Sequence, residues 1–268
     1  MRDALVTLGI DLAADRLKTA ACAIRWEAGE AAPTTLRRNL GDDDLHALIG
    51  GAHWTGIDAP FSWPVAFRCA LADHGERGGW PADYRSLDYQ LRATDRFVAG
   101  IARRPLSVST DRIGVTAMRC ARLLEELGAA RGRRLRLTGE DRVVEVYPAA
   151  ALSAWGAKDA GFDPLGYKTG PGATPKRRAL VQSFMAATGG WLDWPQDVIA
   201  ACVESDHALD ALIAALVTRA AQLGRTRGPV TDDQRRLAPI EGWIHVPEAG
   251  TLALLRGGTR RPVVRGRP

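Results

Sequence analysis

Apolar and polar positions at the start of the chain follow the period of β-strands. Apolar runs at residues 4–12 and 18–26 are joined by a polar turn at 13–16, and residues 33–38 continue the same pattern. Runs of this length that are bounded by turn residues indicate strands. The pattern therefore predicts a meander of three strands at the N-terminus.

A helix and a fourth strand are expected next. Residues 42–49 open with three aspartates, which suit the positive end of a helix dipole, and apolar residues recur through the segment. An apolar run from Trp54 to Asp58 then predicts a strand, which Pro60 ends. The chain thus continues from the meander through a helix into a further strand.

Residues 61–135 are rich in glycine, proline, tryptophan and arginine, with one helical period at 117–127. Such composition is typical of loops and short helices, and predicts an insertion over one end of the sheet. β-Branched residues at 142–147 then predict a fifth strand, which stops at Pro148. Together these elements indicate an α/β protein with a mixed sheet, flanked by helices and carrying helical insertions.

The C-terminal part is predicted to be helical. A second Gly/Pro-rich insertion at 156–175 is followed by helical periodicity at 176–187 and at 205–223. Residues 256–268 are basic and almost without apolar side chains, which predicts a disordered tail. We expect residues 1–255 to form one domain that contains both insertions.

The amino-acid composition indicates a globular protein with a net positive charge. The 268 residues are 46% hydrophobic and 25% charged, as in ordinary globular proteins. The net charge is +5, and almost all of the positive charge is arginine, a side chain that grips phosphate with a planar fork. This bias favours a nucleic-acid partner, although it also follows from coding-sequence composition.

Targeting and redox signals are absent from the sequence. The apolar run near Met1 is too short for a signal peptide, and no run approaches the roughly 18 apolar residues of a membrane span. Four scattered cysteines form neither a zinc motif nor a disulfide framework, so we expect buried thiols. These features predict a cytoplasmic protein that does not enter a membrane.

The tripeptide Gly-Ile-Asp occurs twice, at residues 9–11 and 56–58, each time at the C-terminal end of a predicted strand. If the two strands are parallel neighbours about 4.8 Å apart, Asp11 and Asp58 emerge together at the edge where open α/β sheets bind ligands. Two carboxylates so close repel each other unless a cation lies between them. The alternative is that each aspartate merely ends a strand in a turn, or is compensated by an arginine or by backbone N–H groups.

The start of the helix at 205–223 adds further candidate ligands. Asp206 and Asp210 are four residues apart, and His207 and Asp210 three apart, so either pair shares one helix face. Asp206 alone could instead favour the helix dipole behind Ser205, and a lone histidine is more often a surface residue. Asp210 has no such explanation, because it lies within an apolar run.

Clustered carboxylates are the ligands of hard divalent cations, so Mg²⁺ or Mn²⁺ is the expected cofactor. Two such ions about 3.5–4 Å apart would activate water and stabilise a leaving oxygen in phosphodiester hydrolysis. Cationic side chains must then hold the substrate phosphates. The candidates, each also explicable as a solvated surface charge, are Arg92, Arg96, Lys168, Lys176, Arg177 and Arg178.

Several segments resemble a known family. They read GIDLA at 9–13, GIDAPFSWP at 56–64, RATDR at 92–96, VVEVYPAAAL at 143–152, YK at 167–168, DHALDALIAAL at 206–216 and EGWIHVP at 241–247. The chain is similar through about residues 5–247 to the domain of unknown function 429, a family described as predicted nucleases with an RNase H fold. This resemblance implies an RNase H-like sheet and a nuclease activity.

The resemblance also implies roles for particular residues. The helix that carries Asp210 is similar to the last acidic helix of Holliday-junction resolvases, which implies that Asp210, with Asp206 or His207, completes a site begun by Asp11 and Asp58. The family motif around Glu145 suggests a catalytic role, and the alternative is an ion pair with a nearby arginine. Arg92 and Asp95 belong to a further motif and either pair with each other or close over substrate.

Three functions remain open at this point. The first is a metal-dependent nuclease that acts on DNA or RNA, as a monomer or a homodimer. The second is a phosphotransferase of the actin and sugar-kinase superfamily, whose chains also open with a strand and Gly-Ile-Asp; residues 12–14 lack the glycine and hydroxyl side chains that approach a nucleotide phosphate. The third is a binding module that keeps the RNase H scaffold without catalysis.

Overall fold

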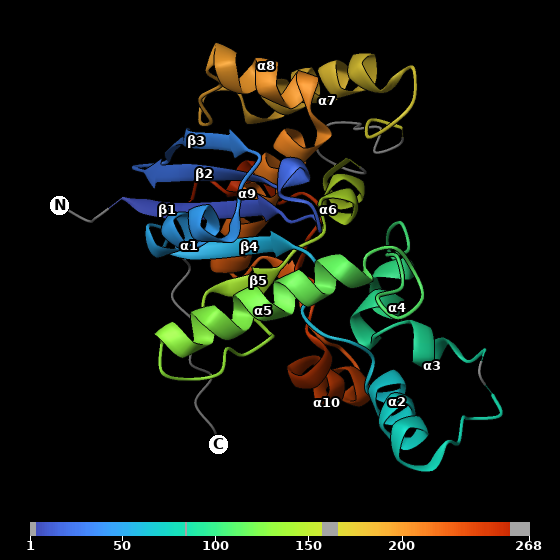
Figure 1. Ribbon diagram of the computed structural model, residues 1–268. Coiled ribbons are helices and arrows are strands. Elements are labelled where there is room, and N and C mark those ends of the chain that lie inside the picture. Colours follow the sequence, from blue (N-terminus) through green and yellow to red (C-terminus); the bar gives the residue numbers. More distant parts are fainter. Residues whose placement is uncertain (1–3, 84, 157–165, 258–268) are drawn as a thin grey trace, which may run out of the picture.

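A five-stranded mixed sheet forms the centre of the protein (Figure 1). The computed structural model describes residues 4–83, 85–156 and 166–257. The strands lie in the order β3-β2-β1-β4-β5, with β1, β4 and β5 parallel and β2 and β3 antiparallel. Their bounds are Leu5–Asp11 for β1, Ala20–Glu27 for β2, Glu30–Arg38 for β3, Trp54–Asp58 for β4 and Val143–Glu145 for β5. This confirms the predicted meander and parallel strands, and the topology is consistent with an RNase H-like fold.

Helices cover both faces of the sheet (Figure 1). On one face, α1 (Asp42–Gly50) and α5 (Gly114–Ala130) bury apolar side chains against Leu8, Ile10 and Ile57. On the other face lies α9 (Asp206–Gln222), which is buried along almost its whole length. The sheet is therefore the middle layer of three.

The period-two alternation of β1 and β4 decides which side chains meet α9. Leu8 and Ile10 point to the α5 face, so Thr7, Gly9 and Asp11 point to the α9 face, where the Thr7 hydroxyl donates to the carbonyl of Ala215. Asp58 shares this side, because it stands in register with Asp11. The alternation thus directs both aspartates toward the helix that carries Asp210.

The remaining elements surround these layers. They are α2 (Val65–Arg77), α3 (Leu87–Gln90), α4 (Ala93–Ala99), α6 (Pro148–Trp155), α7 (Ala173–Thr188), α8 (Gln196–Glu204), α10 (Asp232–Glu241), the short strands β6 (Thr226–Arg227) and β7 (Val246–Pro247), and the 3-10 turns η1 (Arg16–Lys18) and η3 (Leu252–Leu254). Helices α2, α3 and α4 lie beyond one end of the sheet, close to α10 (Figure 1).

Some sequence predictions need correction. The helix expected at 117–127 is α5, but it packs on a sheet face, because its apolar stripe meets the strands. The fifth strand is shorter than expected, since Pro148 starts α6. Cys69 is exposed on α2, whereas the other three cysteines are buried as predicted. The predicted disordered tail lies outside the described residues from 258 onward.

Within the described ranges, the helices are too short or too polar to cross a lipid bilayer.

Candidate functional site

Three aspartates from distant parts of the chain converge at the C-terminal ends of β1 and β4. Asp11 and Asp58 are direct partners in the parallel register, and α9 brings Asp210 beside them. One carboxylate oxygen of each lies within 4.8 Å of the other two, and this trio can share a metal ion. The structure therefore brings together the residues of both Gly-Ile-Asp triplets and the helix acid, as the sequence predicted.

The glycines of the two triplets make this convergence possible. A Cβ atom on Gly9 would lie 2.3 Å from the carbonyl oxygen of Ala211, and one on Gly56 would lie 2.1 Å from the hydroxyl oxygen of Thr218. Real Cβ atoms do not approach other atoms so closely. Helix α9 can therefore come this near to β1 and β4 only because Gly9 and Gly56 have no side chains. The close approach carries Asp210 into reach of Asp11.

Asp210 is held by two consecutive residues of another chain segment, Tyr167 and Lys168. The hydroxyl of Tyr167 donates to Oδ1 of Asp210 at 2.7 Å, and Nζ of Lys168 lies 2.6 Å from Oδ2. Asp210 is 1% exposed, so these partners supply the compensation that a buried carboxylate requires. Lys168, predicted to bind substrate phosphate, is thus paired with one of the three acids.

His207 contacts Asp11 directly. Its Nδ1 lies 2.6 Å from Oδ2 of Asp11, and the ring is half-buried. The contact leaves Oδ1 of Asp11 without a partner among the described residues, while Asp58 makes no side-chain hydrogen bond or ion pair to any of them. Asp206, the other predicted ligand, is half-buried and is not part of the trio.

Burial is the largest influence on the pKa values of Asp11 and Asp58. Burial raises the pKa of Asp11 to about 6, against the hydrogen bond from His207. Burial also raises the pKa of Asp58 well above its ordinary value, with further upward contributions from Asp11 and Asp210. Burial lowers the pKa of Lys168, but the three carboxylates outweigh this and raise it. Without a cation, the charged forms of Asp11 and Asp58 are therefore disfavoured.

Glu145, predicted to be catalytic, lies beside the aspartates and belongs to a buried ion-pair network. Arg92 donates to both oxygens of Glu145, at 2.8 and 2.6 Å, and to both oxygens of Asp95, at 3.0 and 2.9 Å. Its remaining N–H reaches the carbonyl of Glu241 at 3.1 Å. A guanidinium has five N–H donors, so Arg92 has none left for a substrate phosphate.

The pairing of Arg92 with Asp95 and Glu145 follows from their burial. Arg92, Asp95 and Glu145 are each no more than 2% exposed, and a charge at such depth must be paired. Glu241 joins the network from α10, because its carboxylate accepts from the backbone N–H groups of Val65 and Ala93. The alternative reading of Glu145 as the partner of an arginine is the one that the structure confirms.

A cleft of about 480 Å³ opens over the aspartates, with Asp11, Asp58, Lys168 and His207 in its wall. Of the other predicted phosphate ligands, Arg96 pairs with Asp88, and neither it nor Lys176 lines the cleft. Three arginines that the sequence reading missed do line it, namely Arg103, Arg104 and Arg112. They lie in a segment without periodicity, and only their clustering with Pro105 in a basic loop could have drawn attention to them.

These three arginines form the rim of the cleft, and they are available to bind a ligand. Arg103, Arg104 and Arg112 are exposed, and within the described part of the chain none of them has an ion-pair partner. The cleft therefore combines an acidic floor with a basic rim, an arrangement suited to a cation below and an anion above.

Comparison with known proteins adds one finding. The sequence model of the family described as protein of unknown function (DUF429) matches residues 9–235. Comparison with curated proteins and with solved structures gives no significant match.

Proposed function

The chain belongs to the DUF429 family of proteins of unknown function. From the geometry of its own site we propose that it is a divalent-metal-dependent hydrolase of phosphodiester bonds in nucleic acid. The observation that carries this proposal is that one carboxylate oxygen each of Asp11, Asp58 and Asp210 lie within 4.8 Å of one another. It rests on side chains from three separate segments.

The donor set fits a hard cation. All three groups offer carboxylate oxygens, the ligands that Mg²⁺ and Mn²⁺ prefer, and neither a thiol nor an imidazole belongs to the set. The raised pKa values of Asp11 and Asp58 mean that a cation would relieve existing repulsion. A bound divalent ion would supply an activated water and charge stabilisation at the phosphate.

The chain's own residues then have separable tasks. Asp11 and Asp58 hold the cation at the ends of their strands, and Asp210 closes the third side while Tyr167 fixes its orientation. Lys168 places a positive charge at the wall of the cleft, beside the position of the reacting phosphate. These side chains bind and orient, and their rigidity comes from the strands and the buried helix.

The rim favours a polyanionic substrate. Arg103, Arg104 and Arg112 surround an acidic floor that would repel a phosphate without a cation. A strand of nucleic acid can place one phosphate at the metal and its neighbours on the rim, whereas a small phosphoester uses only part of this surface. The arrangement therefore supports nucleic acid over a small substrate.

The test combines metal binding with cleavage. Wild-type protein should bind Mn²⁺ by calorimetry and cleave a fluorescent oligonucleotide, and Asp58→Asn should lose both, with cleavage reduced at least about 100-fold. Asp43→Asn, an exposed aspartate on α1, is the matched control and should behave as wild type. Absence of Mn²⁺ binding at millimolar metal, with the fold intact, would overturn the proposal.

A specific observation supports a binding module as the second candidate. Lys168 and His207 already pair with Asp210 and Asp11, so two of the three acids are compensated without a metal. Asp58 argues against it, because its carboxylate is left without a partner among the described residues. Mn²⁺ binding that requires Asp58, but without cleavage, would favour the module.

The turn after β1 argues against a phosphotransferase. The N–H of Ala13 donates to the hydroxyl of Thr19, and the carbonyl of Ala13 accepts from Arg119. In a phosphotransferase this turn would offer its backbone N–H groups to nucleotide phosphates. Here the turn is tied to neighbouring side chains.

A further inference from the structure

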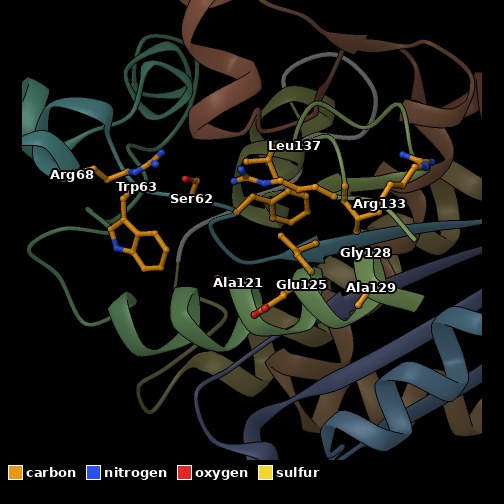
Figure 2. A pocket seen from close by; sticks show the side chains of 13 residues that line it. Ser62, Trp63, Arg68, Ala121, Glu125, Gly128, Ala129, Arg133 and Leu137 are labelled. Carbon is orange, nitrogen blue, oxygen red and sulfur yellow. The ribbon is translucent and has the colours of Figure 1, made fainter. Parts of the chain in front are cut away.

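A second cavity, of about 570 Å³, lies between α5 and the chain segment that follows β4 (Figure 2). We call it the α5 pocket, after the residues that line it, among them Phe61, Trp63, Arg68, Leu124, Arg134 and Leu137. It shares none of its lining residues with the cleft over the aspartates. Its volume is within the range of ligand-binding cavities.

The shape of the α5 pocket suits a flat apolar group. Three small residues of α5, Ala121, Gly128 and Ala129, line the pocket together with Leu124 and Glu125, and Leu137 lies across from them (Figure 2). A Cβ atom on Gly128 would lie 2.8 Å from the carbonyl of Arg133, so the loop after α5 folds back tightly and closes one end.

Trp63 stands at the other end, close to Arg68 (Figure 2). Its side chain is half-buried and makes no hydrogen bond within the described part of the chain. An indole in this position offers a face on which another ring can stack, without losing an existing interaction.

The charged side chains that line the α5 pocket favour an anionic ligand. Arg68 and Arg134 are exposed and have no ion-pair partner within the described ranges, whereas Arg133 lies 2.5 Å from Asp141. Glu125 is the single acid in the lining. Two unpaired guanidinium groups beside an apolar slot are complementary to an aromatic ring that carries a phosphate.

The pocket is tied to the candidate catalytic site. Phe61 follows Asp58 by three residues, a span of at most about 11 Å in extended chain. The N–H of Phe61 donates to Glu145 at 3.1 Å, so the buried network fixes the start of the pocket wall relative to the strand end. A ligand in the α5 pocket is therefore held at a defined distance from the aspartates.

From these observations we propose that the α5 pocket binds an unpaired nucleobase of a single-stranded nucleic-acid substrate, stacked near Trp63, with a neighbouring phosphate on Arg68 and Arg134. The proposal rests on the proposed function and names its substrate class as single-stranded. A base inside a duplex has both faces stacked and its edge paired, and it could not enter the slot without being flipped out.

The test is a binding measurement on the full chain in EDTA, where no cleavage interferes. Anisotropy would follow a fluorescent 15-nucleotide single strand and the same strand annealed to its complement. Trp63→Ala should weaken single-strand binding about tenfold and Trp63→Phe only about twofold, because a phenyl ring retains most of the stacking. Duplex binding should not change.

Variants of the exposed Arg68 and Arg134 provide a second experiment, which does not require a tryptophan variant to fold. Arg68→Gln with Arg134→Gln should reduce the slope of log K against log salt by about 0.7 for the single strand, because one phosphate contact is lost. Arg236→Gln, an exposed arginine on α10, is the matched control and should leave the slope near that of wild type.

The outcomes separate the two proposals. Unchanged single-strand binding in Trp63→Ala and in the double arginine variant, or equal losses for single strand and duplex, would overturn the pocket assignment even if Mn²⁺-dependent cleavage requires Asp58. The expected binding losses without any cleavage would support the pocket and overturn the hydrolase alone.

Discussion

Gly9 lies directly against the backbone of Ala215, where a Cβ atom would come within 2.1 Å of the Ala215 amide nitrogen. This contact sets the separation between β1 and α9, and with it the distance from Asp11 to Asp210. The glycine of the triplet is thus as necessary to the site as its aspartate.

Gly9→Ala should therefore prevent α9 from docking. We expect a loss of more than about 3 kcal/mol of unfolding free energy, because an added methyl group must displace helix backbone. Urea unfolding would measure it. Gly50→Ala is the control, since nothing lies within 4 Å of a Cβ there, and it should leave stability unchanged or slightly higher. A stable Gly9→Ala protein that still binds Mn²⁺ would contradict this account.

Asp58→Asn should stabilise the metal-free protein. Burial raises the pKa of Asp58, so above about pH 4 the folded state binds more protons than the unfolded state, and stability falls as the pH rises. Asparagine carries no charge that is costly to bury. The unfolding free energy of Asp58→Asn should therefore exceed that of wild type by about 0.5–2 kcal/mol at pH 7.5, and the two should be equal at pH 4. Denaturation in EDTA at both pH values measures the difference, and a destabilised variant at pH 7.5 would argue against it.

Metal affinity should fall in acid. The pKa of Asp11 is about 6, and its protonated form cannot ligate a cation, so binding must displace a proton. Below pH 6 the Mn²⁺ affinity should decrease by at least about tenfold per pH unit, because Asp58, whose pKa is also raised, must lose its proton as well. Calorimetry from pH 5 to 8 measures the profile. An affinity that stays constant between pH 5 and 7 would show that Asp11 is not a ligand.

Glu145→Gln tests the buried network against a catalytic role. Removing one charge from a buried ion pair should cost about 3–5 kcal/mol of unfolding free energy. Mn²⁺ affinity of the folded variant should stay within about twofold, since Glu145 is engaged with Arg92. Arg96→Gln, which breaks an exposed pair with Asp88, is the control and should cost less than about 1 kcal/mol. Full stability with lost metal binding would instead make Glu145 a ligand.

The rim arginines should govern nucleic-acid affinity. Arg103→Gln with Arg112→Gln should lower the salt slope of single-strand binding by about 1.4, because each lost phosphate contact removes about 0.7. Cleavage should show a higher KM with little change in kcat, since neither residue reaches the aspartates by hydrogen bond. Salt titrations of binding would give the slope, and Arg236→Gln should match wild type. An unchanged slope would remove these arginines from the substrate path.

The parts of the fold that follow local periodicity could be read from the sequence. The meander, the helix at 205–223 and the convergence of Asp11, Asp58 and Asp210 all follow from alternation, helical spacing and the repeated Gly-Ile-Asp. Each of these signals lies within a few consecutive residues. Parallel pairing of two strands then brings the signals to one edge.

What escaped prediction depends on distant partners. Glu145 and Arg92 are separated by 53 positions, and nothing local in either segment shows that they pair. A charged motif is compatible with substrate binding and with burial, and only the fold decides between them. Arg103 and Arg112 were missed for the opposite reason, because an irregular loop has no period that indicates which way its side chains point.

The guanidinium of Arg92 also bears on how the protein is made. It joins α4 to β5 and, 149 residues later, to the end of α10, so this part of the molecule is closed by contacts of long sequence separation. Such contacts form slowly. During synthesis on the ribosome, the Arg92 network that lies between the two cavities cannot close until Glu241 has emerged. The nascent chain therefore carries its aspartates before it can hold a substrate against them.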